Sequence, residues 1–306
     1  MANHLVKDRT DGNGGMLRTA ALTSLALVAF AANSLLGRLA LGAAQIDPTS
    51  YTSVRLLSGA VTLWAIVALS GRRNRTAHPL AWVSAAMLFL YAISFSFAYL
   101  SLDAGIGALI LFGAVQITMI LVGISEGKHP SAREWLGLLM AFGGLIYLVS
   151  PGLSAPAPLG SLLMFAAGVA WGLYTLRGRG GGDPVVGTAT NFALAVPFAL
   201  LVSLAWLKGL NITARGAWLA VLSGGIASGL GYVIWYAALK GLTTTRAAIV
   251  QLSVPVLAAM GGVLVLGEAL TLRLLLATAT ILGGVALAIF GRDAARRAMA
   301  RQAAGR

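Results

Sequence analysis

Polar side chains are rare within the apolar stretches of this chain, and their types suit binding better than catalysis. The uncharged candidates are Asn33, Gln116, Asn191 and Gln251. An amide donates and accepts hydrogen bonds at once, so it can hold the polar end of a small organic molecule. No Asp, Glu or His lies in the middle of an apolar stretch, and the chain has no cysteine, so acid–base, thiolate and metal chemistry lack their usual side chains. We therefore expect a binding site with no cofactor and no metal.

Aromatic residues provide a second set of candidates. Tyr91, Phe95 and Tyr99 recur every four residues, which places them on one face of a helix. The others lie in two later stretches: Trp171, Tyr174, Tyr232, Trp235 and Tyr236. Such rings are often simple packing, but Tyr and Trp carry polar groups that hydrocarbon does not favour. We predict that they line a site for an apolar side chain, where cation–π contact can hold an ammonium group, and that Tyr99 and Tyr236 act as gates toward opposite faces.

The elements that must position these residues are apolar stretches long enough to cross a membrane. Of the 306 residues, 58% are hydrophobic and 10% are charged, whereas a soluble domain is about 25% charged. About 20 apolar residues span the ~30 Å hydrocarbon core. Ten such stretches lie at 19–42, 49–70, 80–101, 104–124, 133–150, 158–176, 185–207, 216–239, 244–266 and 271–291. The sequence therefore predicts an all-α integral membrane protein with ten transmembrane helices.

The basic residues indicate how these helices are oriented. Sixteen of the 22 Lys and Arg residues flank one side of the predicted spans, against Lys208, Arg215 and Arg273 on the other. Because positive charge is retained in the cytoplasm, both termini are expected there, in a bacterial inner membrane. The net charge of +13 then reflects topology and contact with anionic lipid. We expect no nucleic-acid partner and treat the chain as a monomer.

One segment of the chain is repeated. Residues 103–150 resemble residues 245–291: Glu126 matches Glu268, and Gly143-Gly144 match Gly283-Gly284. Each half holds five spans, so the second half enters the membrane from the opposite side, as in transporters with inverted repeats. The predicted division is a cytoplasmic tail (1–18), repeat 1 (19–150), a periplasmic linker (151–157), repeat 2 (158–291) and a basic cytoplasmic tail (292–306).

Several residues near the span ends have predicted structural roles. Glu126 and Glu268 precede Ser131 and Thr271, which are plausible N-caps, so we expect the glutamates to organise turns. Pro255 lies within the ninth span and predicts a kink, with Gln251 one turn earlier on the same face. Three arginines lie inside or at the ends of the predicted spans. Arg38 and Arg55 lie near the outer face, where they can pair with Asp47 or attract anions, and Arg246 lies near the inner face.

These residues resemble those of a known family. The signature Pro255…Leu266-Gly267-Glu268…Gly283-Gly284, together with the two five-span halves, is similar to the EamA family of the drug/metabolite transporter superfamily. Arg55, Trp171 and Tyr174 also fit that pattern, and the resemblance covers about residues 19–291. Within the family, the chain looks most like the YddG-type exporters of aromatic amino acids and other small metabolites. One departure is Gly113, where the second half has Pro255.

The resemblance and the residues together predict a carrier rather than an enzyme. It would export small amphipathic metabolites, chiefly aromatic or large neutral amino acids, by alternating access. Because no ionisable relay is predicted at membrane depth, we expect uncoupled transport. Hydrophobic cations, nucleobases and similar metabolites are the alternative substrates. A channel or a scaffold is the alternative class, and a membrane-embedded enzyme is disfavoured by the lack of catalytic side chains.

Overall fold

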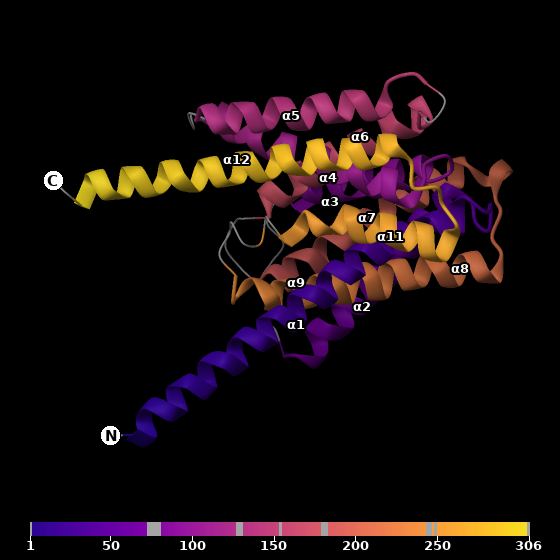
Figure 1. Cartoon of the computed structure of the whole chain (residues 1–306). Helices are drawn as coiled ribbons and strands as arrows, with labels where there is room; N and C mark the ends of the chain where they lie inside the picture. Colours follow the sequence, from indigo (N-terminus) through magenta and orange to yellow (C-terminus); the bar gives the residue numbers. More distant parts are fainter. Residues whose placement is uncertain are drawn as a thin grey trace.

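The computed structural model describes residues 2–71, 81–126, 131–152, 155–178, 183–242, 247 and 250–304, with side chains from Gly15 to Phe290 within these ranges. Arg246 lies outside the described residues. The regular elements of these ranges are helices, apart from an isolated β-bridge between Ile46 and Ile212 (Figure 1). The helices are α1 (Ala2–Leu41), α2 (Pro48–Leu69), α3 (Ala81–Ala98), α4 (Ala104–Ser125), α5 (Ala132–Val149), α6 (Pro158–Arg177), α7 (Pro184–Ala205), η1 (Leu207–Gly209), α8 (Ala214–Val221), η2 (Leu222–Leu230), α9 (Gly231–Leu239), α11 (Ser253–Leu266) and α12 (Leu272–Ala304).

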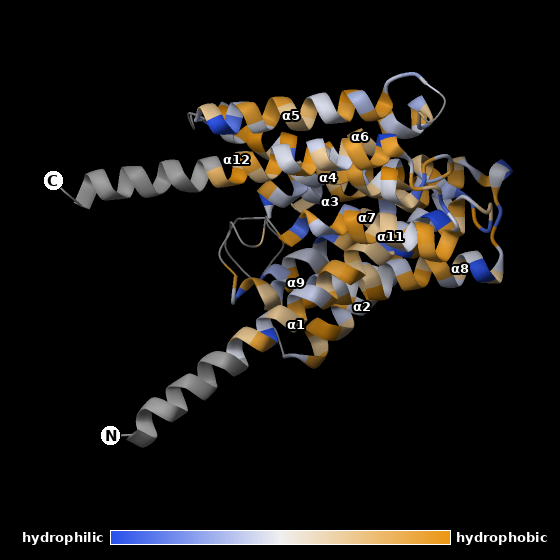
Figure 2. Ribbon diagram, viewed as in Figure 1, coloured by the Kyte–Doolittle hydropathy of each residue, from blue (hydrophilic) through white to orange (hydrophobic). Residues whose placement is uncertain are grey.

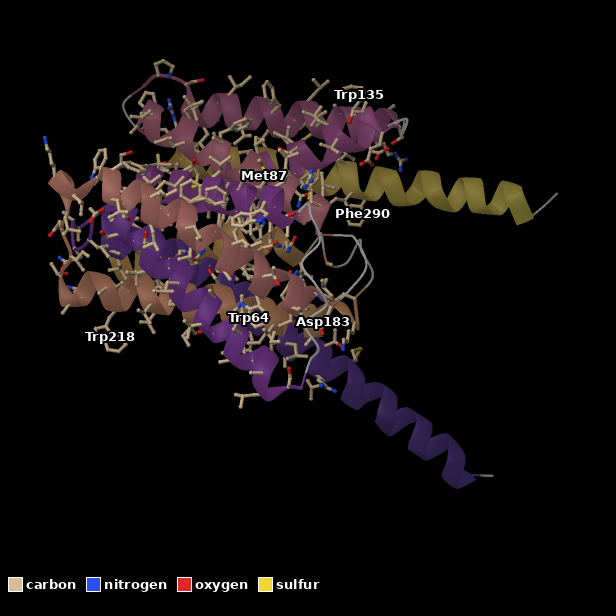
Figure 3. All side chains as sticks on the ribbon, turned by 180° about the vertical axis from the view of Figure 1, so that it is seen from behind. Trp64, Met87, Trp135, Asp183, Trp218 and Phe290 are labelled. Atoms are coloured by element: carbon tan, nitrogen blue, oxygen red, sulfur yellow. The ribbon has the colours of Figure 1, made fainter. Side chains whose placement is uncertain are left out.

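Most of these helices have the length and composition of membrane spans. Within the described residues, nine helical stretches are long and apolar enough to cross a bilayer, from Gly15–Leu41 to Leu272–Phe290, and α8, η2 and α9 together form one of them, Ala214–Leu239. Ser253–Leu266 is apolar but shorter. Hydrophobic residues colour most of the described helical ribbon (Figure 2), and many large apolar side chains are exposed on the bundle, such as Leu264 at 80%. Trp135 and Trp218 point away from the bundle near opposite ends (Figure 3), as expected for rings at the two membrane interfaces.

Local chemistry explains where several helices begin. Asp47 accepts hydrogen bonds from the backbone N–H groups of Thr49 (3.1 Å) and Ser50 (3.0 Å), and Pro48 fits the first helical position because no intrahelical bond is needed there. The two predicted N-caps are confirmed: Ser131 forms a capping box at the start of α5, and Thr271 accepts from the backbone N–H of Leu274 (3.1 Å).

The helices pack in recurring pairs. α5 lies against α12, α3 against α6 and α7, α2 against α7 and η2, α4 against α6 and α11, and α1 against α9 and α11. The pair α5–α12 lies side by side along one edge of the bundle, and both chain termini extend from the same end (Figure 1). A side-chain carbon at Gly284 would lie 2.6 Å from the carbonyl oxygen of Gly137, so α5 and α12 approach backbone to backbone.

Two departures from regular helix shape the interior. Pro255, which was expected to kink its span, is the third residue of α11, and the turn residue Leu252 separates α11 from the helical residues Val250 and Gln251. Proline has no backbone N–H to donate to the carbonyl of Gln251, four residues earlier, and it is tolerated in a first turn because an N–H there has no intrahelical partner. The second departure is η2, a nine-residue π-helical segment between α8 and α9. Its Gly224 packs directly on the backbone carbonyl of Arg55, so η2 and α2 meet beside that arginine.

Candidate functional site

The most buried charged residue of the described chain is Arg55, on α2. It is 2% exposed and donates a hydrogen bond from Nη2 to the hydroxyl of Tyr91 on α3 (2.7 Å). Its guanidinium carbon lies 5.1 Å from the ring centre of Tyr91 and 4.6 Å from that of Phe95, both within cation–π range. Tyr91 and Phe95 therefore hold this charge from one side.

Two further helices join this group through hydrogen bonds. Asn33 on α1 donates from Nδ2 to the hydroxyl of Tyr91 (3.3 Å). Ser223 on η2 donates to Oδ1 of Asn33 (2.5 Å). The group Asn33, Arg55, Tyr91 and Ser223 thus links α1, α2, α3 and η2, and we call it the polar network.

An aromatic cluster adjoins the polar network. Trp171 on α6 lies with its ring centre 4.9 Å from Tyr91, 5.2 Å from Tyr174 and 5.4 Å from Tyr232. The last two pairs are stacked, with interplanar angles of 30° and 18°. We call Tyr91, Trp171, Tyr174 and Tyr232 the aromatic cluster. Its flat faces beside a charged and hydrogen-bonding group suit a molecule that is apolar at one end and polar at the other.

Hydrogen bonds continue from the cluster toward the end of the bundle from which the termini extend. Asn191 on α7 donates to the hydroxyl of Tyr174 (3.3 Å). The hydroxyls of Thr188 and Tyr236 lie 2.9 Å apart and share a hydrogen bond between α7 and α9. Tyr236, one of the predicted gates, therefore ties two helices together at this end.

The opposite end is held by tyrosine packing and ion pairs. Tyr99 is fully buried, with its ring edge-on to Phe95 at 4.6 Å and its hydroxyl donating to the carbonyl of Ala104 (3.3 Å). Arg38, whose guanidinium also contacts the backbone carbonyl of Tyr99, pairs with Asp103 at 3.3 Å and with Glu268 at 3.5 Å. The rings of Tyr91, Phe95 and Tyr99 contact one another in sequence.

Glu268 has a structural contact that its place in the sequence did not indicate. Its two carboxylate oxygens accept from the backbone N–H of Ala104 at 2.9 and 3.0 Å, so it caps the first turn of α4 from a distant loop. Burial raises the pKa of Glu268, partly offset by the bond from Ala104 and by Arg38. Glu126, its counterpart in the repeat, lies exposed at the C-cap of α4.

Three polar atoms of this region are buried without a hydrogen-bond partner among the described residues: Arg55 Nη1, Tyr51 Oη and Ser228 Oγ. The proposed pairing of Arg55 with Asp47 is not observed, because Asp47 bonds to Thr49, Ser50 and Asn211. Within the described part of the chain, Arg55 has no ion pair with a carboxylate, whereas Arg38 pairs with Asp103 and Glu268. Arg55 is therefore a buried charge with a free donor.

The structure does not bring every predicted residue into this group. Gln116 is buried in α4 and Gln251 is half-buried just before α11, and neither takes part in the polar network. Trp235 packs against Phe30 on α1, with ring centres 5.8 Å apart, in a separate cluster with Ala26 and Ala238. These residues lie beside the site without joining the hydrogen bonds that define it.

Two members of the site were not predicted. Tyr51 lies four residues before Arg55, which puts both on one face of α2, and this spacing was readable in the sequence. Ser223 had no comparable signal, because the π-helical turns of η2 change which side chains face α1. No group of three His, Cys, Asp or Glu residues that could hold a metal occurs among the described residues.

Comparison with known proteins gives a family match for the second half of the chain. Residues 158–290 match the model of the EamA-like transporter family. An uncharacterized protein of Pseudomonas aeruginosa, PA1977, is 53% identical over 277 residues, which is 90% of this chain and 96% of that protein. An uncharacterized transporter of Archaeoglobus fulgidus is 27% identical over 74% of this chain and 83% of its own length.

More distant similarities agree with this match. The uncharacterized transporter YoaV of Bacillus subtilis is 19% identical over 81% of this chain and 89% of that protein. A protein of known crystal structure aligns with a TM-score of 0.58 and 22% identity, covering 87% of this chain and 95% of that one. At this identity the structural likeness concerns the fold alone.

Proposed function

Since the chain belongs to the EamA-like transporter family and is a multi-pass membrane transporter, we propose that it exports small amphipathic metabolites, chiefly aromatic and large neutral amino acids. The proposal places it with the YddG-type exporters of this family. The bacterial inner membrane is its proposed location, with both termini in the cytoplasm, on the evidence of the basic residues.

One observation carries the substrate proposal: Trp171 stacks with tyrosines directly beside the polar network. Its ring lies 4.9 Å from Tyr91, and the hydroxyl of Tyr91 bonds to both Arg55 and Asn33. A flat apolar side chain would stack among these rings, while its polar end would meet Asn33 and Ser223. Without an Asp or Glu in the network, an obligate cation is less well suited than a molecule with a neutral or anionic end.

The proposed mechanism is alternating access between two inverted five-helix repeats, residues 19–150 and 158–291. The helix contacts support this mechanism. When each helix is replaced by its counterpart in the other repeat, the pair α3–α6 becomes α9–α1 and the pair α4–α6 becomes α11–α1, and the two helices of each of these pairs are in contact. The ninth span, which would bring the number of spans to ten, would be residues 244–266, which include α11. Tyr99 and Tyr236 would close opposite ends of the path, and release of the Thr188–Tyr236 bond would open the inner one.

Coupling to protons is not required by this arrangement. The charged residue of the polar network is an arginine, which stays protonated at physiological pH. We therefore propose uncoupled transport down the substrate gradient. Uphill accumulation driven by an imposed pH gradient alone would contradict this part of the proposal.

Counterflow in proteoliposomes tests the function. Labelled phenylalanine is the tracer, and tryptophan, leucine, threonine, a hydrophobic cation and a nucleobase are competitors. We expect saturable exchange that amino acids with large side chains compete for. Trp171→Ala should reduce exchange by about tenfold or more, because a stacked aromatic contact and its buried area are lost, and Trp171→Phe should retain much of it. The matched control is Trp218→Ala, which replaces a tryptophan that is 68% exposed at the bundle surface.

The same assay separates the alternatives. Exchange of the cation or the nucleobase, without exchange of phenylalanine, would support a transporter and contradict the amino-acid substrate. Flux without saturation or counterflow would indicate a channel.

A further inference from the structure

We propose that Arg55 is an anion-binding residue, whose free Nη1 donor receives the carboxylate of the transported molecule, with the hydroxyl of Tyr51 as a second donor. This proposal rests on the proposed function, and narrows the substrates to small carboxylates that carry an apolar group. It makes the negative charge, rather than the amino group, the feature that the carrier requires.

The first support is the burial of unpaired donors. Arg55 is 2% exposed and Tyr51 is fully buried. Nη1 of Arg55 has no hydrogen-bond partner among the described residues, and Oη of Tyr51 lies near Ser223 without a hydrogen bond of normal geometry. A buried donor without an acceptor is costly and uncommon in folded proteins. A carboxylate presents two acceptor oxygens, which matches two donors on one face of α2.

The second support is the charge itself. An ionised side chain within a membrane span is expensive, and is normally paired. The ionisable groups that interact with Arg55 are tyrosines, namely Tyr91, Tyr51 and Tyr232, and none of them supplies a negative charge at neutral pH. Of the nine Asp and Glu residues of the chain, none described lies within ion-pairing distance of Arg55. A bound anion would supply the missing charge.

The third support is that the guanidinium is held in place without an anion. Tyr91 engages Nη2 at 2.7 Å, Phe95 lies under the guanidinium carbon at 4.6 Å, and Gly224 packs on the carbonyl of Arg55. One edge of the planar group is therefore fixed while the other is free. An arginine in this arrangement is prepared to bind a carboxylate, since little side-chain freedom remains to be lost.

The aromatic cluster determines which kind of apolar group the bound carboxylate must carry. Tyr91 contributes to both groups, because its hydroxyl accepts from Arg55 and its ring contacts Trp171 at 4.9 Å. A molecule bound at Arg55 through its carboxylate would therefore direct its apolar part toward Trp171 and Tyr232. Phenylalanine and 3-phenylpropionate satisfy this geometry equally, whereas phenethylamine and phenylalaninamide offer no anion.

A ligand series on the unmodified protein tests the inference. Purified protein is heated in detergent with 3-phenylpropionate, hexanoate, their amides, and phenethylamine at equal concentrations. We expect the two carboxylates to raise the unfolding temperature and the amides and the amine to require about 10- to 100-fold higher concentrations, the effect of one lost charge-assisted hydrogen bond. Equal shifts from amides and carboxylates would overturn the inference.

Variants assign the effect to the residue. Arg55→Gln should abolish the carboxylate-dependent shift, and Arg55→Lys should retain part of it. Arg215→Gln, a matched control at an exposed arginine, should leave it unchanged. A carboxylate shift that persists in Arg55→Gln would place the anion elsewhere and refute the assignment.

The two proposals fail in different ways. Transport of phenethylamine at the rate of phenylalanine would refute the role of Arg55 as a carboxylate-binding residue, and the proposal that the protein exports aromatic metabolites would still hold. A carboxylate shift that depends on Arg55, without transport of any aromatic amino acid, would keep the anion site and discard the proposed substrate.

Discussion

Replacing Glu268 by alanine is expected to lower the free energy of unfolding by about 1 kcal/mol, whereas glutamine should be nearly neutral. The carboxylate of Glu268 caps the backbone N–H of Ala104 at 2.9 and 3.0 Å. Loss of an N-cap costs about 0.5–2 kcal/mol. Alanine removes this acceptor, while glutamine keeps one oxygen for it.

The charge of Glu268 adds little to this value. Its pair with Arg38 is 3.5 Å long with both side chains partly exposed, and such pairs contribute about 0–1 kcal/mol. Burial raises the pKa of Glu268 above its usual 4.5, so the folded protein binds this proton more tightly than the unfolded chain. Stability is then greatest below pH 4.5 and falls as the pH rises through the folded pKa. Glutamine should remove this fall.

Denaturant unfolding in detergent, followed by far-ultraviolet circular dichroism, measures these differences. The variants are Glu268→Ala, Glu268→Gln and each of them combined with Arg38→Met. A stability loss for glutamine as large as that for alanine would refute the capping argument and assign the stability to the ion pair. A wild-type level of stability for alanine would show that the contact with Ala104 is unimportant.

Three further predictions concern packing, pH and the inner gate. Gly284→Leu should abolish the folded peak in fluorescence size-exclusion chromatography, because α5 leaves no room for a side chain at this position. Gly283→Leu should be tolerated, because no atom lies within 4 Å of a carbon added there. Equal yields of the two variants would contradict the close packing of α5 and α12. Burial opposes ionisation of Asp47, but hydrogen bonds from Ser50 and Thr49 lower its pKa below 3.8. The ionised Asp47 therefore stabilises the folded protein above pH 3.8, and this stability is lost as the pH falls through the pKa of the folded state. In unfolding measured from about pH 6 to 3, Asp47→Asn should lack this loss, and an unchanged profile would contradict it. Tyr236→Phe removes the bond to Thr188 and should raise the labelling rate of a cysteine at Tyr174 from the inner side, which an unchanged rate would contradict.

The helical membrane architecture was predictable because its signal is carried by long stretches of sequence. Runs of about 20 apolar residues allow few structures in hydrocarbon, and the N-cap role of Ser131 and Thr271 follows from residue type alone. The place of Pro255 was less predictable. Its effect depends on where the helix begins: Leu252 is a turn residue after the helical Val250 and Gln251, and α11 begins at Ser253, so the proline lies in the first turn after an interruption of the helix.

The site was predictable only in part, because residues from six helical elements, α1, α2, α3, α6, η2 and α9, meet there. The four-residue spacing placed Tyr91, Phe95 and Tyr99 on one face, and the three rings are in contact. The partner of Arg55 could not be deduced in this way. Asp47 is near in sequence, but Tyr91 comes from another helix, and the choice depends on how α2 and α3 pack. Ser223 was hidden by the π-helical turns of η2, whose side-chain periodicity differs from 3.6 residues.

Photocrosslinking with a substrate analogue tests the central claim most directly. A labelled phenylalanine carrying a photoreactive group on its ring is bound to the purified protein, irradiated, and mapped by peptide mass spectrometry. We expect crosslinks in the peptides of α3, α6 and α9 that hold Tyr91, Trp171 and Tyr232, and we expect excess phenylalanine and 3-phenylpropionate to suppress them. Crosslinks confined to α5 and α12 or to the loops, or crosslinks that excess phenylalanine does not suppress, would contradict it.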